Sequence, residues 1–159
     1  MKKFLKVLDN IEELFLLPSF CFSVALLFIQ VVARYVFKSS LTWSEELARY
    51  LFVWQIWIGI SYCVKNGTHI RVTLLKDFLG KKANKILEII VLIIWFGFGC
   101  FVINQGYANA MRIASFGQKS SALQIPMQYA YMAIPVGAAL MNIRLVQNLI
   151  KLFKKEVAA

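Results

Sequence analysis

Four long apolar segments constrain this chain more than any other feature of its sequence. A helix needs about 20 predominantly apolar residues to cross the ~30 Å hydrocarbon core of a bilayer, and this chain of 159 residues has room for four such helices. Hydrophobic residues make up 60% of the sequence, so almost nothing is left for a soluble domain. The pattern predicts one all-α membrane domain, residues 1–159, with transmembrane helices at about 14–37, 43–64, 85–109 and 125–150.

Two shorter segments are amphipathic and too charged to cross a membrane. Residues 1–13 place apolar side chains such as Phe4 and Leu8 on one stripe and lysines on the other side, and residues 70–80 repeat this pattern. We expect both to form short helices on the membrane surface. The polar groups in and beside the second segment are either simply solvated or contact lipid headgroups or a partner; they are His69, Arg71 and Lys76.

The positive charges are distributed unevenly between the two sides of the membrane. With four spans both termini share a side, and that side, with the loop after the second span, holds thirteen of the 18 Lys and Arg residues. The other side holds five, namely Arg34, Lys38, Arg49, Arg112 and Lys119. The positive-inside rule therefore predicts that both termini are cytoplasmic. The placement of the basic residues thus indicates the topology, and the net charge of +10 indicates attraction to anionic membrane lipids and not nucleic-acid binding.

The start of the second span carries more polar groups than an apolar helix needs. Thr42 and Glu45 have the spacing of a capping box, which predicts a helix start at Thr42. Arg49 lies within reach of both Glu45 and Glu46. Either this is a capped helix end with a local ion pair, or one glutamate is left over for a partner. The resulting candidates for a partner interface are Trp43, Glu45, Glu46, Arg49, Trp54 and Trp57.

Small residues and prolines predict where the spans approach one another. The tight connection between the first two spans requires them to be antiparallel neighbours. Pro126 suits the first position of the fourth helix, and Pro135 predicts a kink in it because proline removes one backbone hydrogen bond. Pairs of small residues four apart predict close helix contacts at Gly59 and Cys63, at Gly106 and Ala110, and at Ala133 and Gly137.

Reactive groups are missing from the centres of the spans. Carboxylates, lysines and histidines are costly at mid-depth and are kept there for function, yet none of the four predicted spans has one near its middle. His69 is the only histidine, so one chain cannot hold a haem between two histidines. The three cysteines are isolated in apolar surroundings and read as small hydrophobes. We expect a chain that is not an enzyme, uses no cofactor and supports a partner.

Three sequence motifs resemble those of a known membrane-protein family. They are WSEELARY at residues 43–50, GTHIRV at 67–72, and SSALQIP at 120–126 followed by Tyr131, Pro135 and Gly137. In this order, with four spans, they look like the small membrane subunit of tripartite ATP-independent periplasmic (TRAP) transporters. The similarity extends over essentially the whole chain.

The resemblance implies a role in a bacterial inner-membrane transporter. In such a system a periplasmic binding protein delivers an organic acid, such as a C4-dicarboxylate or a sialic acid, to a large membrane subunit that imports it with sodium by an elevator-type movement. The small subunit would be the static, non-catalytic scaffold. Two other classes remain open from the residues alone: an autonomous small transporter made by self-association, and a quinone- or haem-linked redox subunit.

Overall fold

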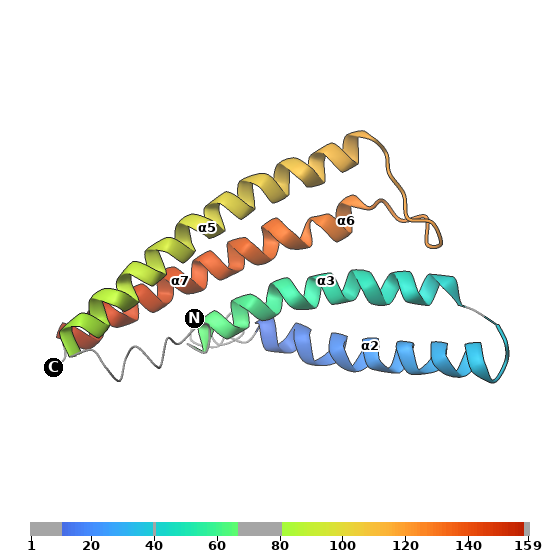
Figure 1. The fold of residues 1–159 in the computed structure, drawn as a ribbon, viewed down its shortest axis with the longest axis horizontal. Helices are drawn as coiled ribbons and strands as arrows, with labels where there is room; N and C mark the ends of the chain where they lie inside the picture. Colours follow the sequence, from blue (N-terminus) through green and yellow to red (C-terminus); the bar gives the residue numbers. More distant parts are fainter. Residues whose placement is uncertain (1–10, 40, 67–80, 158–159) are drawn as a thin grey trace, which may run out of the picture.

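The computed structural model describes residues 11–39, 41–66 and 81–157, which are mainly helical (Figure 1). The helices are α2 (Ile11–Tyr35), α3 (Thr42–Lys65), α5 (Lys81–Ser115), α6 (Gln128–Tyr131) and α7 (Ala133–Val157). Four stretches of these residues are long and apolar enough to cross a membrane: Glu12–Tyr35, Thr42–Lys65, Ile86–Ser115 and Gln128–Ile150. This confirms the predicted all-helical fold with four candidate membrane spans.

The predicted surface segments fall mainly outside the described residues. Residues 1–10 and 70–80 belong to that part of the chain, together with the candidates His69, Arg71 and Lys76. Residues 11–13, which the sequence assigned to the first surface segment, instead form the first turn of α2. The first membrane helix therefore starts earlier than predicted and includes two glutamates.

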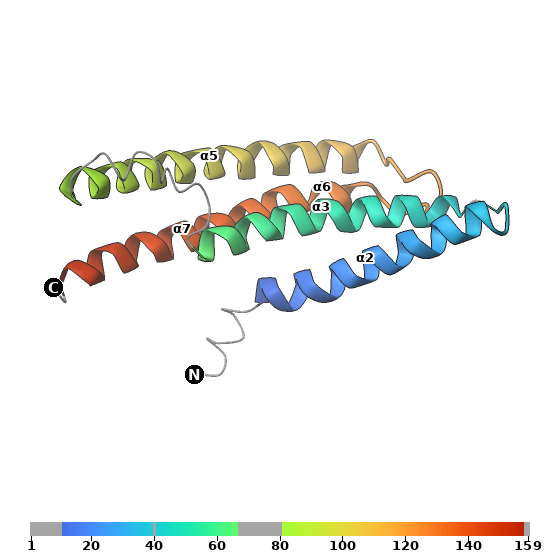
Figure 2. The same cartoon turned by 60° about the horizontal axis from the view of Figure 1, so that its bottom comes forward.

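The central helices of the molecule are α3 and α7. α2 packs against α3, α3 packs against α7, and α5 packs against α7, so the order across the molecule is α2, α3, α7, α5 (Figures 1 and 2). Burial agrees with this order: 44% of the most apolar window is buried in the α6–α7 span, against 6% in α5. Large apolar side chains such as Phe28 on α2 and Ile94 on α5 are exposed, which suits lipid or protein surroundings.

The two loops described between spans lie at one end of the molecule. The connection between α2 and α3 and the loop of residues 116–127 are both at the right of Figure 1, and we call this the outer end. The start of α2, the end of α3, the start of α5 and the end of α7 lie toward the opposite, inner end. The antiparallel pairing of the first two spans is thereby confirmed.

The fourth span is interrupted near its outer end. Pro126 does not begin the helix as predicted; it lies in an antiparallel bridge with Lys119, and α6 starts two residues later. α6 ends at Tyr131, Met132 follows, and α7 continues from Ala133. Pro135 stands in the first turn of α7, and because it has no backbone N–H, the carbonyl of Tyr131 lacks its usual helical donor.

Small residues allow close approach at some predicted positions and not at others. A Cβ added at Gly137 would lie 2.5 Å from the Trp57 Cβ and 2.9 Å from its carbonyl oxygen, so α7 and α3 touch closely there, as predicted. Gly106 on α5 meets the side chains of Ile134 and Pro135 in the same way. The pair formed by Gly59 and Cys63 was predicted wrongly: Gly59 faces open space and Cys63 is exposed.

Candidate functional site

The carboxylate of Glu46 binds the loop between the last two spans. Its Oε1 accepts hydrogen bonds from the Ser121 N–H at 3.0 Å and the Tyr50 hydroxyl at 3.2 Å. Its Oε2 accepts from the Ala122 and Leu123 N–H groups, both at 2.9 Å. The WSEELARY and SSALQIP motifs, more than 70 residues apart in the chain, are therefore in direct contact at the outer end.

The loop is shaped to present those backbone donors together. The Ser120 N–H donates to the Ile125 carbonyl at 2.9 Å, and the Gln124 N–H donates to the Ser120 carbonyl at 3.2 Å. Gln124 adopts a left-handed φ of 56°, which closes the turn. Successive N–H groups in such a turn form a concave anion-binding surface, and Glu46 fills it from α3.

Glu45 binds α2 and not Arg49. Its Oε1 accepts a hydrogen bond from Gln30 Nε2 and lies 3.7 Å from Arg34 Nη1. The predicted pairing of Arg49 with the glutamates is therefore wrong, because Arg49 is exposed and forms no ion pair within the described part of the chain. Within the described residues, it is therefore Arg49 and not Glu45 that lacks an ion-pair partner on a neighbouring helix.

The predicted capping box does not form at the start of α3. The helix does begin at Thr42, but Leu41 is its N-cap residue and no side chain caps it. Ser44 Oγ donates instead to the Leu41 carbonyl at 2.7 Å. Glu45 cannot complete a capping box because its carboxylate is occupied across the helix interface.

The tryptophans of α3 have different surroundings. Trp43 is 42% exposed at the outer end, and Trp54 is half-buried. The Cβ and backbone of Trp57 lie against Gly137 on α7. That any of these side chains contacts a partner remains a prediction.

A second polar cluster joins three helices toward the inner end. Glu12 on α2 accepts from Arg144 on α7 through two bonds, Nε to Oε1 at 2.7 Å and Nη2 to Oε2 at 2.9 Å. Ser61 on α3 donates to Glu12 Oε1 at 3.1 Å, and Arg144 Nη1 donates to Gln147 Oε1 at 2.7 Å. The Glu12 and Arg144 side chains are 0% and 7% exposed, so this is a buried, bidentate ion pair.

Sequence reasoning missed this ion pair. Glu12 lies in the predicted surface segment 1–13, and Arg144 is one of the thirteen basic residues that the charge count places on the side of the termini. The available signal was the position of Arg144 inside an apolar helix, since a guanidinium there requires a carboxylate or other acceptors. Nothing in the sequence alone identified the first turn of α2 as the source.

Polar groups nearer the middle of the spans also bind one another. Gln55 Nε2 on α3 donates to Ser23 Oγ on α2 at 2.9 Å, and both side chains are buried. Asn142 Nδ2 on α7 donates to Cys100 Sγ on α5 at 3.4 Å, where the missing side chain of Gly99 makes room for the amide. Among the described residues no group of three or more His, Cys, Asp or Glu could hold a metal ion. These polar contacts connect helices and do not form a recognisable reaction site.

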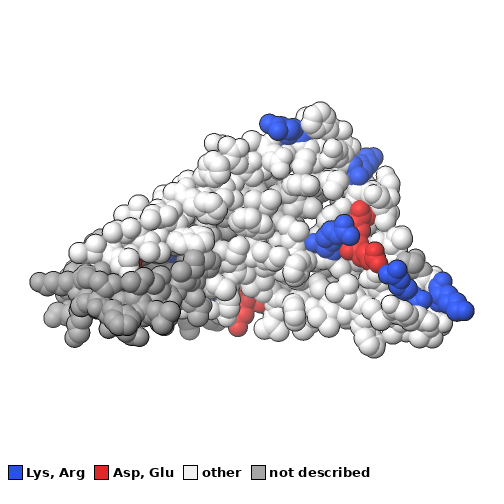
Figure 3. All heavy atoms as spheres, viewed as in Figure 1, with Lys and Arg blue, Asp and Glu red and all other residues white. Residues whose placement is uncertain are grey.

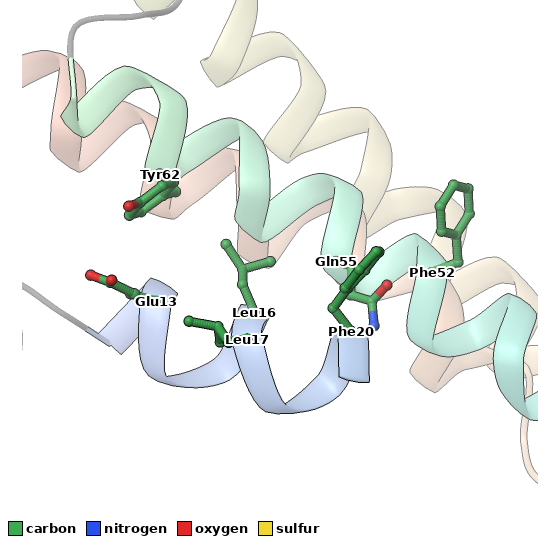
Figure 4. Close-up of a pocket in the computed structure, with 7 residues that line it drawn as sticks. All are labelled: Glu13, Leu16, Leu17, Phe20, Phe52, Gln55 and Tyr62. Atoms are coloured by element: carbon green, nitrogen blue, oxygen red, sulfur yellow. The ribbon is translucent and has the colours of Figure 1, made fainter. Parts of the chain in front are cut away.

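A groove runs between α2 and α3. One section has a volume of about 410 Å³ and is lined mainly by apolar side chains of both helices, with Glu13 and Tyr62 at its inner end and Phe52 at the other (Figure 4). The neighbouring section, about 510 Å³, shares Phe52 and reaches Arg34 and Arg49 at the outer end. On the face shown in Figure 3, most charged side chains of the described residues gather at the outer end.

One family model matches most of the chain. It covers residues 23–155 and is described as tripartite ATP-independent periplasmic transporters, DctQ component. The matched region includes α3, α5, α6, about half of α2 and most of α7, and therefore both sides of the contact between Glu46 and the SSALQIP loop.

Several named proteins are similar over most of this chain. A sialic acid TRAP transporter small permease protein, SiaQ, of Vibrio cholerae is 31% identical over 97% of this chain and 88% of its own length. A C4-dicarboxylate TRAP transporter small permease protein, DctQ, of Rhodobacter capsulatus is 24% identical over 90% of this chain and 76% of its own. An isethionate TRAP transporter permease protein, DctMQ, of Oleidesulfovibrio alaskensis is 29% identical over 88% of this chain, which spans only 23% of that relative.

Proposed function

The chain belongs to the family of small permease components of TRAP transporters, and we propose that it is the static scaffold subunit beside a larger membrane subunit of such a transporter. A component of this family is part of a transporter and not an enzyme. The large subunit would carry the substrate inward with sodium by an elevator-type movement. This chain would hold the membrane frame against which that movement takes place.

The observation that carries the proposal is how the polar groups of the spans are used. Glu12, Arg144, Gln55 and Ser23 are buried, and their hydrogen bonds join different helices of this chain. A transport site at mid-depth needs charged or coordinating groups that face a substrate or an ion. These four buried side chains make connections within the chain, as a scaffold requires.

The longer relative supports a large membrane subunit as the partner. This chain matches 23% of the isethionate transporter DctMQ, and it likewise matches 23% of a sialic acid TRAP transporter permease protein, SiaT, of Haemophilus influenzae. In these relatives the matching region and a much longer permease sequence are parts of one polypeptide, so the two are held together. We expect the same association between separate chains here, with a periplasmic binding protein as the third part.

The relatives also support an organic acid as the substrate. Their names include sialic acid and C4-dicarboxylates, both of which are organic anions. We propose that the complex imports one of these classes, with the binding protein and the large subunit determining which one.

The charge distribution supports an orientation in a bacterial inner membrane. One side of the membrane has only five of the 18 Lys and Arg residues, and Arg34, Lys38 and Lys119 at the outer end are among these five. We propose that the outer end is periplasmic and that both termini are cytoplasmic. A cysteine placed at Lys119 should then react with a membrane-impermeant maleimide in intact spheroplasts, whereas one placed at Asn66 should react only after lysis. The reverse pattern would contradict this orientation.

Reconstitution tests the scaffold proposal. Sodium-driven uptake of radiolabelled sialic acid and of succinate is measured in proteoliposomes containing this chain and the large subunit, with binding protein outside. We expect uptake of one of them only when all three proteins are present. Uptake by this chain alone would contradict the proposal and favour an autonomous homo-oligomeric transporter. Full uptake without this chain would contradict it as well.

A further inference from the structure

The outer section of the groove between α2 and α3 combines two chemically different surfaces. Part of its lining is apolar and open, since Leu27, Val31 and Phe52 are 46%, 53% and 58% exposed, and the polar Ser23 and Gln30 lie beside them on α2. Arg34, near the outer end of α2, and Arg49 on α3 also line it, together with Glu45. A groove that combines open apolar surface with two arginines matches an amphipathic, anionic ligand.

The charges at the outer end leave a net positive site. Glu45 also lines this section, but its carboxylate already accepts from Gln30 and lies beside Arg34. The three charged groups therefore sum to one positive charge. The Arg34 side chain is 62% exposed and a guanidinium has five N–H donors, so Arg34 can bind a second anion while it pairs with Glu45. Planar arginine side chains are well suited to phosphate oxygens.

The length of this section corresponds to one leaflet of a bilayer. Its lining on α2 extends from Ser23 to Arg34, which is ~16 Å at 1.5 Å rise per residue. Half of the ~30 Å hydrocarbon core is about 15 Å. Arg34 thus stands at the depth of lipid headgroups while the apolar lining follows the acyl chains of the same leaflet, as for a snorkelling arginine at a helix end.

We infer that this groove binds one glycerophospholipid with an anionic headgroup. Its phosphate is held by Arg34 and Arg49, and an acyl chain lies along Leu27, Val31 and Phe52. The inference rests on the groove and on the family's membrane location, and it is independent of the proposed scaffold role. Loss of lipid binding would leave the reconstitution result unchanged as a test of that role.

Native mass spectrometry with a defined lipid tests the inference. The full-length chain is purified in mild detergent, with any membrane partner that stays bound, and titrated with phosphatidylglycerol. We expect one retained lipid per chain, and we expect Arg34→Gln/Arg49→Gln to weaken its binding by about tenfold, since two charge-assisted contacts are lost. The matched double variant Arg112→Gln/Lys119→Gln removes the same charge outside the groove and should change binding by less than about twofold.

A second variant avoids any disturbance of the pair between Arg34 and Glu45. Leu27→Trp fills the groove and keeps every charge, so it should also reduce the retained lipid by about tenfold. Inorganic phosphate should not compete, because it lacks the acyl chain. Equal weakening by the two double variants, absence of a retained lipid from the wild-type chain, or cross-linking of Val31→Cys to another polypeptide across the groove would each overturn the inference.

Discussion

Glu46 shows how one side chain connects distant parts of this chain. It receives three backbone N–H groups from the loop at residues 121–123 and the hydroxyl of Tyr50. A carboxylate is an acceptor with two oxygens, which suits this all-donor environment. The neighbouring Glu45 binds α2, so the adjacent glutamates hold two different segments to α3.

We predict that Glu46→Gln loosens the loop at residues 121–123. The glutamine amide replaces one acceptor oxygen by an N–H₂ donor, which faces backbone donors and cannot bind them. Hydrogen–deuterium exchange of the amides at 121–123 should become faster by on the order of tenfold. Lys38→Ala, at the same end but outside this contact, should leave their exchange unchanged; equal effects of the two variants would show that Glu46 has no special part.

We predict that Arg144→Met destabilises the chain strongly. It leaves the Glu12 carboxylate buried without its bidentate partner, and breaking a buried pair in this way costs about 3–5 kcal/mol. The double variant Glu12→Leu/Arg144→Met removes both charges and should recover most of the loss. Thermal unfolding in detergent measures both, and a double variant less stable than the single one would contradict this explanation.

At the scale of the helices, the contact between α3 and α7 organises the fold. Gly137 brings α7 against the backbone of Trp57, and a cluster of buried apolar side chains, Val64, Met141 and Leu145, lies on the same pair of helices. Small residues are effective here because helices in lipid associate by close packing and not by hydrophobic burial.

We predict that Gly137→Ala separates α3 from α7 while Gly59→Ala does not. A methyl group at 137 would overlap the Trp57 backbone, and such overpacking costs about 1–3 kcal/mol. A methyl group at Gly59 would meet no atom within 4 Å and should instead stabilise its helix slightly. Melting temperatures of the two variants in the same detergent test this difference, and similar losses for both would refute it.

The helices could be predicted from sequence better than their connections. The lengths of the apolar segments alone identified four spans. Lipid offers no hydrogen-bond partners, so a single apolar segment that crosses the membrane satisfies its backbone N–H and C=O groups by forming a helix. The partner of each polar group could not be predicted. Arg49 lies on the same helix turn as Glu46, whereas the groups that actually bind Glu46 from the loop are more than 70 residues away in the sequence. Local spacing favoured the wrong pair for Glu45 and Glu46, and only the tertiary arrangement brings Arg34 and the 121–123 loop to them.

For the same reason the inner cluster escaped prediction. The charges near Glu12 suggested a surface helix, whereas the structure continues α2 through that turn and buries the carboxylate against α3 and α7. The spacing of small residues predicted a helix contact correctly at Gly137 and wrongly at Gly59. Spacing indicates which residues lie on the same face of a helix, but it does not indicate which face packs against another helix.

At the scale of the whole molecule, the helices are arranged so that α2 and α5 flank a central pair (Figure 2). Wide apolar surfaces of α2 and α5 remain available to lipid and to a larger membrane protein. Each interface in the order α2, α3, α7, α5 contains a polar contact or a close small-residue contact. Such a chain is suited to remain one rigid body while its partner moves.

Locking α5 to α7 tests this rigidity most directly. Asn142 Nδ2 lies 3.4 Å from Cys100 Sγ, so a cysteine in Asn142→Cys faces the native Cys100; Cys21 and Cys63 are replaced by serine. After oxidation and confirmation of the disulfide by mass, uptake by the complete reconstituted transporter should stay within about twofold of the reduced state, because a fixed frame does not move internally during transport. Loss of uptake on oxidation that is restored by reduction would contradict the scaffold role.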